Sequence, residues 1–187
     1  MDKNNIVYHG SPVGNLKEIF SSQSTHMKKC IYASKSKVVA FLFMGKGNGD
    51  LDIAIFSQNG QLCIVERRKG VLKNLYDKSG YLYVLNGETF NHYDYLWSKE
   101  VISFEEKLIP ICVVDIENIL EELFLEEKLG NIKIYKYPSR PENIPLDNSD
   151  LINKYINYEK KGLKGSITKL LELYPEFENK IDTKLIK

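Results

Sequence analysis

The chain is poor in the residues that hold small proteins together through covalent bonds or metals. Its 187 residues include three cysteines, Cys30, Cys63 and Cys112, which are widely spaced and each lie in an apolar run. None has a second cysteine or a histidine at ligand spacing, which argues against a zinc site and against a disulfide framework. We therefore expect three small buried side chains in a reducing, cytoplasmic compartment, and no bound metal.

Long apolar runs and an excess of either charge are also lacking. No stretch approaches the roughly 20 apolar residues that cross a membrane, and no apolar segment of the signal-peptide kind follows Met1 to Asn5, so we expect no membrane partner. Lys and Arg number 26 against 25 Asp and Glu, whereas a nucleic-acid binder usually presents a basic face. We interpret the short run Arg67 to Lys69 as the solvated end of a hairpin.

The pattern of short apolar runs predicts an α+β protein whose strands are mainly antiparallel. Asn59-Gly60 lies between two of these runs and is typical of a hairpin turn. We expect strands near residues 6–9, 30–33, 53–57, 62–66, 81–85, 100–104, 108–114 and 132–137, and helices near 14–20, 36–44, 116–129, 150–160 and 166–173. A proline-rich connector starts at residue 138, so we divide the chain into an α+β domain over 1–137 and a helical C-terminal appendage over 138–187 that packs on the same domain.

The strongest hint of chemistry is at the ends of two predicted strands. Tyr8-His9-Gly10-Ser11 closes the first, and Tyr32-Ala33-Ser34 closes the second and leads into a helix. Glycine allows another molecule to approach the backbone closely. An imidazole, a bare peptide and an aromatic face together suit a flat, hydrogen-bonding ligand. A third element, Glu100-Val101-Ile102, places a carboxylate at the head of a late strand.

In these three motifs the chain resembles the ADP-ribosyltransferase superfamily, in particular its diphtheria-toxin and poly-ADP-ribose-polymerase-like branch. That branch carries a His-Tyr-Glu triad on three strands of a split sheet, and His9, Tyr32 and Glu100 match it over roughly residues 6 to 115. The resemblance implies a split, mainly antiparallel sheet with short helices. It also implies NAD as substrate, with no metal.

The resemblance further implies a role for each matching residue. His9 would bind ribose hydroxyls, the Gly10 backbone would pair with the nicotinamide amide, and Tyr32 would stack on the nicotinamide ring. Ser11 and Ser34 would add polar contacts, and Glu100 would stabilise the ribosyl cation. Glu88 competes for the role of carboxylate, although its setting predicts a hairpin surface.

Two other functions compatible with the fold stay open. The first is a non-catalytic module that binds NAD, ADP-ribose or a partner protein. The second is an RNA 2′-phosphotransferase of the same superfamily, which would need basic residues converging on the cleft. The acceptor of an ADP-ribosyl group could be a protein, a nucleic acid, a small molecule or water, and the sequence does not choose among them.

Overall fold

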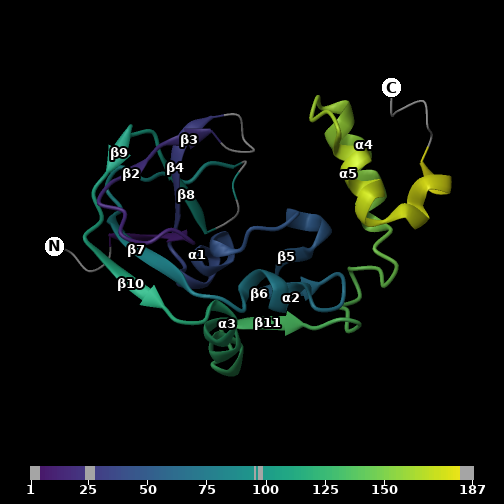
Figure 1. The fold of residues 1–187 in the computed structure, drawn as a ribbon, viewed down its shortest axis with the longest axis horizontal. Coiled ribbons are helices and arrows are strands. Elements are labelled where there is room, and N and C mark those ends of the chain that lie inside the picture. The colour runs from purple at the N-terminus through teal and green to yellow at the C-terminus, as the bar shows by residue number, and fades with distance from the viewer. Residues whose placement is uncertain (1–4, 24–27, 95, 97–98, 182–187) are drawn as a thin grey trace. The chain divides into compact units, whose positions relative to one another are not determined.

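The computed structural model describes residues 5–23, 28–94, 96 and 99–181. The chain forms two compact units (Figure 1). The first comprises Met1–Lys46 and Lys73–Leu129, and the second comprises Gly47–Leu72 and Gly130–Lys187. Each unit combines two segments that are not contiguous in the sequence, whereas the predicted division was a single boundary after residue 137. The division into an α+β domain over 1–137 and an appendage over 138–187 packed on it stays a prediction.

The first unit is built on a six-stranded antiparallel sheet. Its strands run in the order β10-β7-β1-β4-β3, and β8 pairs with β4 off this path. The strands are β1 Ile6–Ser11, β3 Ser22–Gln23, β4 Lys29–Ser34, β7 Gly80–Asn86, β8 Glu100–Ser103 and β10 Cys112–Ile116. A separate two-stranded pair joins β2 Ile19–Phe20 to β9 Lys107–Leu108.

This sheet opens between β1 and β4. The two strands pair at one position only, Tyr8 with Ser34, whereas β1 pairs with β7 over the whole of Ile6–Ser11 and β4 pairs with β8 from Ile31 to Ser34. The sheet therefore has two well-paired parts that diverge on either side of the β1–β4 junction. Alternate residues of these strands, among them Val7, Tyr83 and Val101, form one hydrophobic core.

Helix α1 (Lys37–Met44) packs directly against β1 and is buried along most of its length. The contact requires glycine at position 10, because a Cβ there would lie 1.8 Å from the backbone oxygen of Ala40. Helix α3 (Ile119–Lys128) begins with a side-chain cap, in which the amide of Glu121 donates to Asn118 Oδ1. The sequence did not predict the short helix α2 (Val71–Tyr76).

The second unit combines a three-stranded sheet with the C-terminal helices. Strands β5 (Ile53–Gln58) and β6 (Gln61–Glu66) form the predicted Asn-Gly hairpin, and β11 (Ile132–Tyr135) pairs parallel to β6. Helices α4 (Asp150–Lys160) and α5 (Ser166–Leu173) lie side by side in Figure 1. They share a hydrophobic core with the 3₁₀ segments η1 (Gly49–Leu51) and η2 (Pro175–Lys180).

An ion pair between a buried arginine and a half-buried aspartate fastens α4 to the β6 end of this unit. Arg67 is 3 % exposed, and its two terminal nitrogens lie 2.9 and 2.6 Å from the carboxylate oxygens of Asp150. Arg140 donates to the backbone oxygens of Glu66 and Arg67. The interpretation of this basic run as a solvated hairpin end is wrong for Arg67, because the C-terminal segment returns over it.

Other local expectations are corrected as well. The helix predicted over 14–20 does not form, because Asn15 has φ 57° and the segment leads instead into β2. The strand predicted over 108–114 is divided into β9 and β10 on either side of Pro110. Cys30 and Cys63 are buried as expected, whereas Cys112 lies exposed on β10, a strand at the sheet edge.

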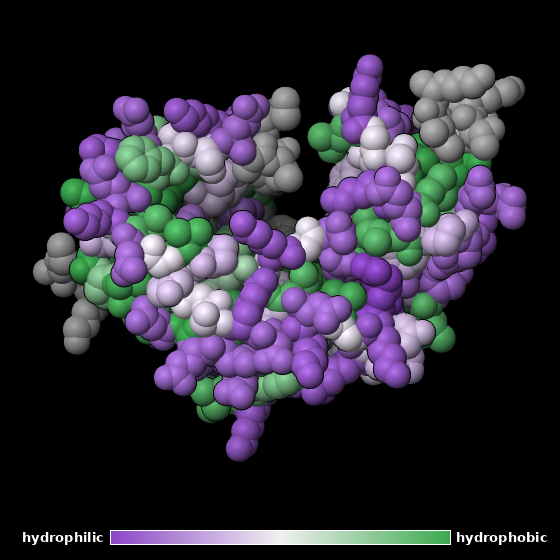
Figure 2. Space-filling model, in the orientation of Figure 1, coloured by the Kyte–Doolittle hydropathy of each residue, from purple (hydrophilic) through white to green (hydrophobic). Residues whose placement is uncertain are grey.

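The architecture is thus α+β, with mostly antiparallel sheets and several short helices. Hydrophobic and hydrophilic side chains are interspersed on the face drawn in Figure 2. None of the helices over the described residues has the length and apolarity that crossing a bilayer requires.

Candidate functional site

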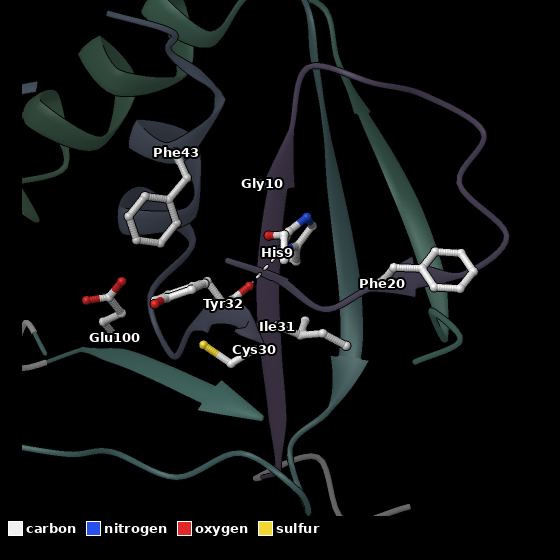
Figure 3. A pocket seen from close by; sticks show the side chains of 9 residues that line it. His9, Gly10, Phe20, Cys30, Ile31, Tyr32, Phe43 and Glu100 are labelled. Atoms are coloured by element: carbon white, nitrogen blue, oxygen red, sulfur yellow. Dashed lines mark hydrogen bonds between the residues drawn. The ribbon is translucent and has the colours of Figure 1, made fainter. Parts of the chain in front are cut away.

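One cavity of about 310 Å³ lies in the first unit, where the sheet opens (Figure 3). Three strands contribute to its lining: β1 supplies His9, β4 supplies Tyr32 and β8 supplies Glu100. Gly10 also lines the cavity, as do residues of β2, β3 and α1. The three residues of the predicted triad, separated by up to 91 positions in the sequence, therefore line the same space.

The imidazole of His9 is held in one orientation. Its Nδ1 lies 2.7 Å from the backbone oxygen of Tyr32, the contact drawn as a dashed line in Figure 3. Burial lowers the pKa of His9 from its ordinary value of 6.5, and the hydrogen bond to Tyr32 opposes this only in part. The ring is therefore neutral near pH 7. Because a carbonyl oxygen only accepts, Nδ1 carries the proton and Nε2 is left as an acceptor.

Two aromatic rings lie on the same side of the cavity. Tyr32 is half-buried, and Figure 3 shows its ring beside the ring of Phe43, with Glu100 close to both. Phe43 is the least buried of the apolar residues along the last turns of α1. Sequence reasoning missed it, since the apolar run of this helix predicted packing for all of its members and did not single out the one that faces a cavity.

Glu100 is the carboxylate that reaches this cavity. It is only 8 % exposed and is the first residue of β8. The competing candidate, Glu88, is exposed in the turn after β7, where its backbone amide donates to Asn86 Oδ1. Glu88 does not line the cavity, so the structure brings Glu100, and not Glu88, together with His9 and Tyr32.

The two serines expected to contact the ligand lie elsewhere. Ser11 Oγ accepts from the amide of Val13 in the turn that follows β1. Ser34 is fully buried, and its hydroxyl donates to the backbone oxygen of Lys99 while accepting from the amide of Ser36. Neither serine lines the cavity, so the structure does not bring these two hydroxyls together with His9, Tyr32 and Glu100, and their contact with a ligand stays a prediction.

No group of three or more His, Cys, Asp and Glu side chains suitable for a metal ion occurs among the residues that the structure describes. The lining residues with polar side chains are His9, Ser22, Cys30, Tyr32 and Glu100. Glu100 supplies the one carboxyl group among them, and apolar residues make up most of the remaining wall.

Comparisons with known proteins found no matching family model, no matching curated protein and no matching solved structure.

Proposed function

We propose that this protein binds NAD in the cavity between β1, β4 and β8 and cleaves the bond between nicotinamide and ribose. ADP-ribose is then transferred to an acceptor or to water. One observation carries the proposal: His9, Tyr32 and Glu100 come from three strands and line one cavity at the opening of the sheet. A neutral imidazole, an aromatic face and a carboxylate are the groups that this reaction needs.

The size of the cavity suits one end of the dinucleotide. Its volume of about 310 Å³ lies at the lower end of the range of roughly 300–1,000 Å³ for small-molecule sites. The nicotinamide and its ribose fit this space, and the rest of NAD would extend beyond it. The nicotinamide ring would lie against Tyr32 and Phe43, because flat rings stack favourably on aromatic faces. His9 Nε2 would accept from a ribose hydroxyl.

The chemical step requires stabilisation of a cation. When the bond from ribose C1′ to nicotinamide breaks, the bonding electrons leave with the pyridine nitrogen, and neutral nicotinamide is released. Positive charge develops on the ribose, as in glycoside hydrolysis. The Glu100 carboxylate, buried in a mostly apolar wall, stabilises that charge and accepts a hydrogen bond from the 2′-hydroxyl. The acceptor then bonds to C1′, and its proton passes to solvent water.

The lining argues against the phosphotransferase alternative. That reaction needs basic side chains to hold a phosphate, and neither Lys nor Arg occurs among the described residues that line the cavity. A non-catalytic module that binds NAD differs from the enzyme only in turnover, so the experiment must measure binding and nicotinamide release separately.

The test compares wild-type protein with Glu100→Gln, incubated with NAD in the presence and absence of cell lysate as a source of acceptors. Glutamine keeps the size and hydrogen-bonding capacity of the side chain but removes its charge. We expect NAD binding to persist while nicotinamide release falls by roughly 100- to 1,000-fold, the scale for removing one electrostatic stabiliser.

Glu88→Gln is the matched control, since Glu88 is exposed and lies outside the cavity. It should bind NAD and release nicotinamide as the wild type does. A wild-type protein that binds NAD but releases no nicotinamide with any acceptor pool would identify the binding module, and one that does not bind NAD would overturn the proposal.

A further inference from the structure

The start of β8, which carries Glu100, is held by two side chains that do not line the cavity. On one side, the hydroxyl of Ser34 donates to the backbone oxygen of Lys99 at 2.8 Å, and the amide of Lys35 donates to the same oxygen. On the other side, Nδ1 of His92 lies 2.9 Å from the backbone oxygen of Glu100. Because that oxygen only accepts, the imidazole is the donor.

Such support matters at this position because Glu100 is the terminal residue of its strand. The β4–β8 ladder runs from Ile31–Ser103 to Ser34–Glu100 and ends there. Terminal pairs of a strand open more readily than the interior. A carboxylate that must meet a developing charge has to be held to within about 0.5 Å, by residues whose own positions are fixed. The hydrogen bond from Ser34 on β4 to the backbone oxygen of Lys99 supplies part of this restraint. The hydrogen bond from His92, in the segment before β8, to the backbone oxygen of Glu100 supplies the rest.

We propose that Ser34 and His92, here called the Glu100 brace, are positioning residues for the carboxylate. The inference rests on the proposed function for its catalytic consequence, but the restraint on the strand end is a property of the fold alone. Ser34 thus holds the backbone of Lys99, and with it the position of Glu100, and this role needs no contact with the ligand. His92, which is exposed at the surface, serves it through a single hydrogen bond to the backbone.

The chain offers a matched control at the other end of the same strand. Ser103 is fully buried like Ser34, and its hydroxyl donates to Thr89 Oγ1 and accepts from the amide of Glu105. Ser103→Ala therefore removes a comparable buried hydroxyl from β8 without touching the brace. His92→Asn provides the conservative variant, because an amide Nδ2–H can take the place of the ring Nδ1–H.

The first measurement is amide hydrogen exchange over residues 99–103 in the wild type and in the Ser34→Ala, His92→Ala and Ser103→Ala variants. We expect faster exchange at Glu100 and Val101 in the two brace variants, and wild-type protection there in Ser103→Ala. Unchanged protection in both brace variants would overturn the brace. This measurement needs no substrate, so it decides the structural inference even if the wild type releases no nicotinamide.

The second measurement is the steady-state rate of nicotinamide release as a function of NAD concentration. Misplacement by about 1 Å can cost roughly 100-fold, so we expect kcat to fall about 10- to 100-fold in Ser34→Ala and His92→Ala. KM for NAD should stay within about twofold, because Tyr32 and His9 are untouched. His92→Asn should restore most of kcat. Loss of kcat in Ser103→Ala equal to that in Ser34→Ala, or no recovery in His92→Asn, would refute a positioning role.

Discussion

Gly10→Ala tests how closely α1 approaches β1, and through that contact the shape of the cavity. A Cβ at position 10 would lie 1.8 Å from the backbone oxygen of Ala40 and 2.8 Å from its carbonyl carbon, whereas real Cβ atoms essentially never come within 3.0 Å of another heavy atom. The helix must therefore withdraw by about 1 Å. Both clashing atoms belong to the backbone of α1, so no change of rotamer can relieve the overlap.

The cost of this withdrawal follows from what the helix buries. Six of the eight residues of α1 are buried, and a forced displacement of packed elements typically costs roughly 1–3 kcal/mol. We expect a value near the upper end, about 2–3 kcal/mol. For a chain of this size, a loss of that order lowers Tm by about 5–10 °C. We expect NAD to raise the Tm of the wild type if it binds in the cavity. Because α1 also carries Phe43, the variant should lose that increase.

The assay is urea denaturation and thermal unfolding, each with and without NAD. Gly60→Ala serves as the comparison, since Gly60 has φ 79° at the hairpin turn and nothing within 4 Å of its Cβ position. It should cost about 1–2 kcal/mol through backbone conformation alone and leave the effect of NAD intact. A loss of stability below about 0.5 kcal/mol in Gly10→Ala would refute the proposed contact.

Three further predictions concern single side chains. Tyr32→Ala should abolish most of the NAD-dependent increase in Tm, because the stacking face is lost; an undiminished shift would place the ligand elsewhere. Burial lowers the pKa of His9 below 6.5, so the unfolded chain binds a proton more readily than the folded chain, and stability should fall as the pH drops below about 6.5. His9→Asn keeps a donor for the Tyr32 carbonyl without titrating, so its Tm should fall less than that of the wild type between about pH 7 and pH 5, and parallel pH profiles would contradict this. Asp150→Asn should destabilise the second unit by roughly 3 kcal/mol in urea denaturation, because the buried Arg67 loses its countercharge. Asp147→Asn, which removes the charge from the exposed pair with Lys180, should cost less than about 0.5 kcal/mol. Equal losses of stability in the two variants would refute the importance of burial.

Local sequence patterns were sufficient to predict most of the strands and the hairpin. Alternation and short apolar runs predicted β1, β4, β7 and β8, and Asn59-Gly60 marked the β5–β6 turn. These signals are readable because a strand with one buried face repeats every two residues and a tight turn needs residues that accept a positive φ. The same strand ends identified His9, Tyr32 and Glu100, which line one cavity.

Local patterns misled where the backbone conformation of one residue decided the outcome. The apolar residues between Gly14 and Phe20 suggested a helix, but Asn15 adopts a positive φ and the segment passes into β2. Helix α2 was missed because it is short and because another residue supports it. It is only six residues long, and part of its support comes from Glu66, whose carboxylate accepts from the amide of Leu72.

The sequence by itself determined the α+β class and the strand ends on which His9, Tyr32 and Glu100 lie, because these depend on neighbours a few residues apart. Only the tertiary structure showed that Phe43 lines the cavity, that the Ser34 hydroxyl donates to the backbone oxygen of Lys99, and that Arg67 is buried against Asp150. Each of these depends on contacts between residues far apart in the chain. A side chain's burial and hydrogen-bond partners are set by the elements that pack against it. The repeat of apolar residues in the local sequence does not indicate which elements those are.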